Sequence, residues 1–157
     1  MNKYIKLIKI KEILIFIILI CFQYPFLNKR IGFISVLKSG HYIGLIINNY
    51  ILITIYRKMK IINHISPLLI LRKDRNTIEK EITLSLIALT GMMVSILYIL
   101  LICFYGILPI NSVLILITLL YFIEVMIIAF QFNKQANILY IMVPVIINLV
   151  FHYIIFQ

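Results

Sequence analysis

Acidic residues, glycines and catalytic motifs are scarce in this sequence, and their scarcity excludes several classes of protein. Of 157 residues, 5 are Asp or Glu and 15 are Lys or Arg, which gives a formal net charge of +10. The 5 glycines build no G-x-x-x-x-G-K-[ST] phosphate loop, and no G-x-S-x-G or H-E-x-x-H motif occurs. The sequence therefore predicts a protein that is not an enzyme and does not itself hydrolyse ATP.

Cysteine and histidine are also few, with 2 and 3 residues in the chain. Cys21 and Cys103 are far apart, and no C-x-x-C pair exists. His41, His64 and His152 lie on three separate segments, and none is at the spacing of a metal site. The sequence therefore predicts no disulfide, no metal site and no cofactor.

Apolar residues dominate what is present. Hydrophobic residues make up 64% of the chain and charged residues 13%, and the mean hydropathy is +1.12. A soluble domain of this length leaves too much of its surface in water to hide that apolar area. We therefore expect an all-α, polytopic membrane protein in which residues 1–157 form a single transmembrane domain. The cations cluster beside apolar segments, which indicates contact with a lipid bilayer and not with nucleic acid.

Five apolar segments predict five membrane spans, at residues 13–27, 42–56, 82–105, 112–132 and 138–156. Residues 1–12 place lysines on one side of a helix and aliphatic residues on the other, which predicts an interfacial helix before the first span. Residues 31–41 have two interpretations, an interfacial segment outside the membrane or part of one tilted span over residues 31–56. In the third span, Gly91 and Ser95 have the small-x-x-x-small spacing that permits close helix approach.

The basic residues set the predicted orientation. Twelve of the 15 fall on the inner side: four before the first span, seven in residues 57–81, and Lys134. This orientation puts the N-terminus in the cytosol and the C-terminus outside. The bias toward isoleucine, lysine and asparagine suggests an AT-rich genome, so we expect the cytoplasmic membrane of a low-GC bacterium.

Residues 57–81 are the most charged segment of the chain. Basic clusters at residues 57–60 and 72–75 bracket the mostly apolar residues 61–71, which reach about 16 Å as a helix and cannot cross a core of about 30 Å. We expect residues 61–71 to lie along the membrane surface or dip into it, with Asn76 and Thr77 capping the start of the third span. An ordinary positive-inside loop would explain the charges, but the length and mixed charge of the segment favour docking of a cytosolic partner.

Four polar residues inside the spans are candidates for function. Glu124 is the only acid deep in a span, and counting helical rise puts Asn148 within a few ångströms of its depth, so a hydrogen bond between them is feasible. Glu124 either contacts a substrate or proton or holds helices together. Asn48 and Asn49, near the middle of the second span, need partners in hydrocarbon and are predicted to face other helices.

The predicted segments follow one another in a fixed order: a basic interfacial helix, a first span, an outer segment and a second span. A basic connection, P-L-L-I-L-R-K-D-R, and an apolar third span come next. This order resembles the membrane subunits of type-2 ABC exporters, particularly small permeases of Gram-positive bacteria linked to bacteriocin or antimicrobial-peptide export and self-immunity. The resemblance implies that residues 61–75 couple to a cytosolic ATPase, with Pro67, Arg72, Lys73 and Arg75 at the contact. It also implies a second membrane subunit or a second copy of the chain. The usual permease has six spans, whereas five are predicted here.

The leading hypothesis is a permease-like subunit of an ABC transporter that moves a peptide or other amphipathic substrate and is energised by a separate ATPase. The rival is a stand-alone membrane protein, an immunity or accessory factor that binds a peptide or another membrane protein without nucleotide. A third alternative is an intramembrane enzyme that uses Glu124 and His152. A neighbouring gene for an ATPase with a phosphate loop would favour the leading hypothesis.

Overall fold

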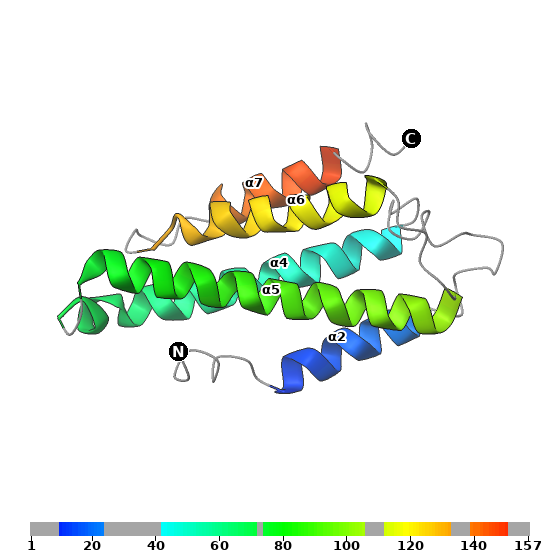
Figure 1. The fold of residues 1–157 in the computed structure, drawn as a ribbon, viewed down its shortest axis with the longest axis horizontal. Helices are drawn as coiled ribbons and strands as arrows, with labels where there is room; N and C mark the ends of the chain where they lie inside the picture. The colour runs from blue at the N-terminus through cyan, green and yellow to red at the C-terminus, as the bar shows by residue number, and fades with distance from the viewer. Residues whose placement is uncertain (1–9, 24–41, 72–73, 106–111, 133–138, 151–157) are drawn as a thin grey trace.

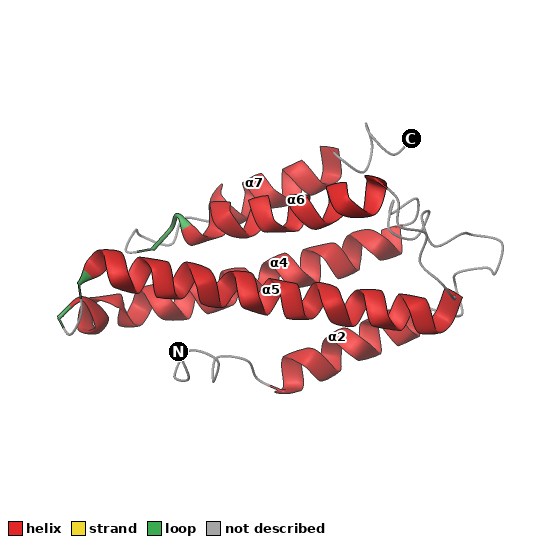
Figure 2. Cartoon of the chain, in the orientation of Figure 1, coloured by secondary structure: helices red, strands yellow, loops and turns green. Residues whose placement is uncertain are grey.

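The computed structural model describes residues 10–23, 42–71, 74–105, 112–132 and 139–150. Within these residues the chain forms α-helices and contains no strand, which confirms the all-α prediction (Figure 2). In chain order the helices are α2 (Ile10–Gln23), α4 (Tyr42–Ile70), α5 (Arg75–Tyr105), α6 (Ser112–Ala129) and α7 (Leu139–Val150). The interfacial helix predicted at residues 1–12 lies largely outside the described residues, and residues 31–41 lie entirely outside them.

The helices α4 and α5 are the longest and form an antiparallel hairpin along the long axis of the molecule (Figure 1). Their 29 and 31 residues reach about 43 Å and about 46 Å at helical rise. Helices α6 and α7 lie on one side of this hairpin and α2 on the other, and α4 packs against all four other described helices. The end where α4 stops and α5 starts extends beyond the ends of α2, α6 and α7 (Figure 1).

The second predicted span and the start of the charged segment form one helix instead of two. The sequence predicts a separate surface segment at residues 61–71, but α4 runs unbroken through Pro67 to Ile70. Pro67 has no N–H to donate to the carbonyl of Asn63, and Ser66 Oγ donates to that carbonyl instead, at 2.8 Å. Because this carbonyl is satisfied, the helix continues past the proline and lengthens the hairpin along its own axis.

The start of α5 also differs from the prediction. The helix begins at Arg75, and the carbonyl of Asp74 accepts a hydrogen bond from the Ile78 N–H at 3.1 Å. Asp74 therefore occupies the N-cap position, where an acidic residue is favoured by the helix dipole. The predicted cap at Asn76 and Thr77 is wrong, because several short polar residues precede the apolar run and only the backbone bond identifies the first turn.

Apolar side chains form both the core and much of the outer surface. One core cluster contains most of its buried residues on α4 and α5, among them Ile51, Ile55 and Met93. Large apolar side chains are also exposed, with Ile18 of α2 at 63% and Leu84 of α5 at 60%. Monomeric soluble proteins rarely expose such extensive apolar surface.

Among the described residues, α5 is the one helix with the length and apolarity of a membrane span, over Arg75–Phe104. The apolar stretches Ile115–Ala129 of α6 and Ile141–Val150 of α7 are shorter. The spans predicted at residues 13–27 and 138–156 both extend past the residues that the structure describes.

The spacing of Gly91 and Ser95 would permit close helix approach, but none occurs there within the described structure. No neighbouring heavy atom lies within 4 Å of the position that a Cβ on Gly91 would take. Ser95 is exposed, and its Oγ donates to the Gly91 carbonyl at 2.7 Å. The two small residues therefore lie on the outer face of α5, where no described helix of this chain covers them.

Candidate functional site

Glu124 is enclosed in the second half of α6. This helix is apolar nearly throughout, and Glu124 lies on its buried face. The Glu124 side chain is 0% exposed, and neither carboxylate oxygen has a hydrogen-bond partner among the described residues. An ionised carboxylate in such a place costs several kcal/mol unless a partner compensates it. The described residues therefore supply no group that satisfies this carboxyl.

Tyr121 lies one turn before Glu124 on the same face of α6 and is 2% exposed. Its hydroxyl donates to Asn48 Oδ1 of α4. Asn48 therefore faces another helix, as the sequence predicts. The adjacent Asn49 has a buried Oδ1 that no described residue bonds. We call Asn48, Tyr121 and Glu124 the buried polar cluster.

Asn148 of α7 is buried at 7% exposure, but it does not bond to Glu124. Its Nδ2 has no hydrogen-bond partner within the described part of the chain, so the predicted Glu124–Asn148 bond is absent. Counting residues along two antiparallel helices estimates the depth of each side chain, but not the direction in which it points around its helix. His152 lies outside the described residues.

A buried ion pair that the sequence analysis missed joins α2 to α4. Lys58 Nζ lies 2.5 Å from Glu12 Oε2, and the two side chains are 2% and 14% exposed. Beside it, the Tyr50 hydroxyl donates to the Glu12 carbonyl at 3.0 Å. The Tyr50 ring stacks on Phe16 with centroids 5.9 Å apart. These contacts seat α2 against α4 through one charged, one polar and one aromatic interaction.

The helical period of the sequence could have indicated that Lys58 is buried. The sequence groups Lys58 in one basic cluster with Arg57 and Lys60, and those two residues are exposed. Lys58, however, lies three residues after Ile55 and four before Ile62, which puts all three on one helix face, and all three are buried. The period identifies the buried face, although it does not identify Glu12 as the partner.

Of the four residues predicted for ATPase coupling, the structure describes two, and both lie at the hairpin end. Pro67 is exposed in the last turn of α4, and Arg75 is exposed as the first residue of α5. Arg72 and Lys73 lie outside the described residues. The predicted coupling segment is therefore the tip of two long helices, and not a separate helix on the membrane surface.

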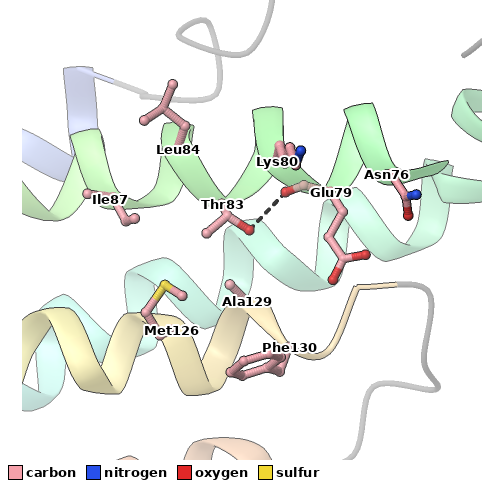
Figure 3. A pocket seen from close by; sticks show the side chains of 9 residues that line it. All are labelled: Asn76, Glu79, Lys80, Thr83, Leu84, Ile87, Met126, Ala129 and Phe130. Atoms are coloured by element: carbon pink, nitrogen blue, oxygen red, sulfur yellow. Dashed lines mark hydrogen bonds between the residues drawn. The ribbon is translucent and has the colours of Figure 1, made fainter. Parts of the chain in front are cut away.

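A pocket of about 480 Å³ opens between α5 and α6 (Figure 3). It is lined by Asn76, Glu79, Lys80, Thr83, Leu84 and Ile87 of α5, by Met126 and Ala129 of α6, and by Phe130, which directly follows α6. The Glu79 carboxylate points toward the end of α6, and the Thr83 hydroxyl donates to the Glu79 carbonyl at 2.8 Å (Figure 3). The pocket is polar toward Asn76 and apolar toward Ile87.

The described residues contain no group of three or more His, Cys, Asp or Glu side chains placed to hold a metal ion. Cys21 and Cys103 are free and exposed. Comparison with protein-family models, curated proteins and solved structures finds no match to this chain. Function is therefore inferred from three features of the chain itself: the buried polar cluster, the charged hairpin end and the pocket.

Proposed function

We propose that this chain is a multi-span subunit of the bacterial cytoplasmic membrane that moves a peptide or other amphipathic molecule. A separate cytosolic ATPase energises the movement, and a second membrane subunit or a second copy of the chain completes the transporter. The N-terminus and the hairpin end, residues 57–81, lie on the cytosolic side. This chain supplies the path through the bilayer, and its partner supplies the nucleotide chemistry.

The hairpin end carries the proposal. Asn63 Nδ2 of α4 donates to the Gln131 carbonyl at 3.0 Å, which marks the level where α6 has ended. Past that level α4 and α5 are the described helices that continue (Figure 1), and they expose charged residues that include Asp74, Arg75 and Lys80. A charged pair of helices that projects from an apolar bundle is suited to electrostatic docking of a soluble protein.

The outer surface supports a membrane location. Large apolar side chains point outward from several helices, with Ile99 at 58%, Leu119 at 54% and Ile146 at 53% exposure. Lipid tails would cover this surface, whereas in water it would promote aggregation. The apolar part of α5 has the length to cross a bilayer core.

The buried polar cluster supports a transport path. Ionisable side chains inside membrane bundles are costly and commonly lie on substrate or proton pathways. Glu124 has no bonding partner among the described side chains, so it is available to a migrating group. Asn48 and Tyr121 bond to each other and join α4 to α6 beside it.

Co-purification from the native host tests the proposal. The tagged chain, extracted in mild detergent, is expected to bring down an ATPase with a phosphate loop in near-stoichiometric amount. The triple variant Arg72→Glu, Lys73→Glu, Arg75→Glu should lose most of that ATPase and still reach the membrane fraction. The control Lys134→Glu reverses one charge on the predicted inner side, outside residues 57–81, and should retain the ATPase. Equal recovery from the triple variant would count against docking at the hairpin end.

A second candidate function is a stand-alone immunity or accessory protein that binds a peptide or another membrane protein. The continuity of α4 favours it, because the surface helix that the permease resemblance implies is replaced by the end of one continuous helix. In this case the same co-purification yields membrane partners or none, without an ATPase. Resistance of the host to an external peptide, lost on deletion of the gene, would then be the informative assay.

A further inference from the structure

We propose that the pocket between α5 and α6 binds one phospholipid with a phosphoethanolamine headgroup from the inner leaflet. The headgroup occupies the polar end of the pocket, and the beginning of an acyl chain follows its apolar end. The inference rests on the membrane location proposed above, with the hairpin end on the cytosolic side.

Along α5, the pocket extends from the charged first turns of the helix into its uncharged part. Residues 75–81 contain charged side chains, and residues 82–105 contain none. The pocket follows α5 from Asn76 to Ile87, about 16 Å at helical rise, so it reaches from the charged part into the apolar part. In a bilayer, headgroups and the first segments of the acyl chains meet at this boundary.

Two opposite charges line the polar end. Glu79 and Lys80 both line the pocket, and neither forms an ion pair with another described residue. Lys80 can donate to a lipid phosphate, and Glu79 can accept from a primary ammonium, while the Asn76 amide adds a neutral donor. A glycerol headgroup has no cation for Glu79, and a choline headgroup has no N–H to donate. The charge pair therefore selects phosphoethanolamine.

The apolar end is uncovered. Leu84 and Phe130 are each 60% exposed and Met126 is 39% exposed, so an acyl chain between α5 and α6 would remove apolar surface from contact with headgroups and water. The volume of about 480 Å³ lies within the range of about 300–1,000 Å³ for small-molecule sites. A partner helix about 10 Å across would need more than twice this volume, about 1,250 Å³, over the same length. The pocket therefore fits a lipid better than a helix.

Fluorescence quenching by brominated lipids tests the proposal on the full chain. The chain has no tryptophan, so Phe130→Trp introduces a single reporter in the pocket. The variant is reconstituted in phosphatidylcholine vesicles into which brominated-chain phosphatidylethanolamine, phosphatidylglycerol or phosphatidylcholine is titrated. Leu119→Trp, at an α6 position 54% exposed and outside the pocket lining, is the matched control. If Phe130→Trp does not fold, Met126→Trp reports from the same pocket.

The pocket reporter should show about threefold or tighter relative binding of phosphatidylethanolamine than of phosphatidylcholine, since charge-assisted hydrogen bonds are lost with choline. Glu79→Gln and Lys80→Gln should each reduce that preference, whereas Lys60→Gln on the hairpin should leave it unchanged. The control at position 119 should show no headgroup preference.

Three results would overturn the proposal: equal quenching by all three lipids, a phosphatidylglycerol preference that depends on Lys80 alone, or no quenching in the pocket while position 119 is quenched. The third result would indicate that protein covers the pocket. Absence of quenching at both positions would instead refute the membrane location, so failure of the lipid site and failure of the proposed function are distinguished.

Discussion

Glu12 and Glu124 are two acids in the same bundle with opposite surroundings. Glu12, near the start of α2, keeps 14% exposure and lies 2.5 Å from the Lys58 ammonium. Glu124, inside α6, is 0% exposed, and both its oxygens lack a partner among the described residues. The ion pair fixes α2 against α4, whereas the buried Glu124 costs stability without a described bond in return. The pair therefore belongs to the architecture, and Glu124 is the better candidate for function.

The neighbouring tyrosines show the same difference. Tyr50 donates to the Glu12 carbonyl and so reinforces the ion pair at the contact of α2 with α4. Tyr121, although one turn from Glu124, donates to Asn48 on another helix. Hydrogen-bonding capacity is therefore present beside Glu124, but it serves to join α4 and α6, and no described residue bonds the carboxyl.

Breaking the ion pair should have the largest effect. Lys58→Met leaves Glu12 without its cation, and the free energy of unfolding should fall by about 3 kcal/mol. Denaturant unfolding in detergent, followed by circular dichroism, measures this. Lys60→Met removes an exposed lysine of the same helix and should change stability by no more than about 0.5 kcal/mol. Equal effects of the two variants would show that the Glu12–Lys58 pair adds nothing to stability.

Removing the unpaired acid should change stability in the other direction. Glu124→Leu replaces an unsatisfied buried group by an apolar one and should raise the free energy of unfolding by about 1–2 kcal/mol. Both Glu124→Leu and Glu124→Gln should abolish export or peptide resistance in the host while the protein still folds. If Glu124→Leu loses as much stability as Lys58→Met, the carboxyl holds helices together and the contrast between the two acids disappears.

Breaking the α4–α6 contact should have an intermediate effect. Tyr121→Phe removes the donor to Asn48 and should lower the free energy of unfolding by about 1 kcal/mol. A double-mutant cycle with Asn48→Ala isolates the coupling between the two side chains. Tyr56→Phe is the control, because the Tyr56 hydroxyl bonds to no described residue. A coupling near zero would mean that the buried polar cluster does not join the helices.

The outer face of α5 should show the smallest effect. Gly91→Ala adds a Cβ that meets no neighbouring atom, so stability should rise by up to about 1 kcal/mol through helix propensity. The same unfolding assay measures this, and size-exclusion chromatography reports the oligomeric state. A fall in stability together with loss of an oligomer would show that a second chain packs against Gly91.

The pattern of neighbouring residues in the sequence predicted part of the fold but less of the buried polar cluster and its contacts. The all-α class and the apolar run of α5 follow from composition and from the length of uncharged sequence. The continuation of α4 past Pro67 does not, because it depends on the Ser66 hydroxyl, which satisfies the Asn63 carbonyl. The spacing of Lys58 to Ile55 indicated its burial, but the sequence analysis grouped it only with the basic residues beside it. Its neighbours Arg57 and Lys60 are indeed exposed, so one cluster contains both environments.

By itself the sequence determined the helical class, the apolar character of the helices, the single acid inside α6 and the charged hairpin end. These are properties of adjacent residues and survive any arrangement of the helices. Only the tertiary structure decided that Glu12 pairs with Lys58 and that Tyr121 bonds to Asn48, 73 residues away in the sequence. It also decided that no described residue bonds the Glu124 carboxylate. The physical reason is that a hydrogen bond or ion pair requires the correct rotation of each helix about its axis, and packing of distant helices sets that rotation.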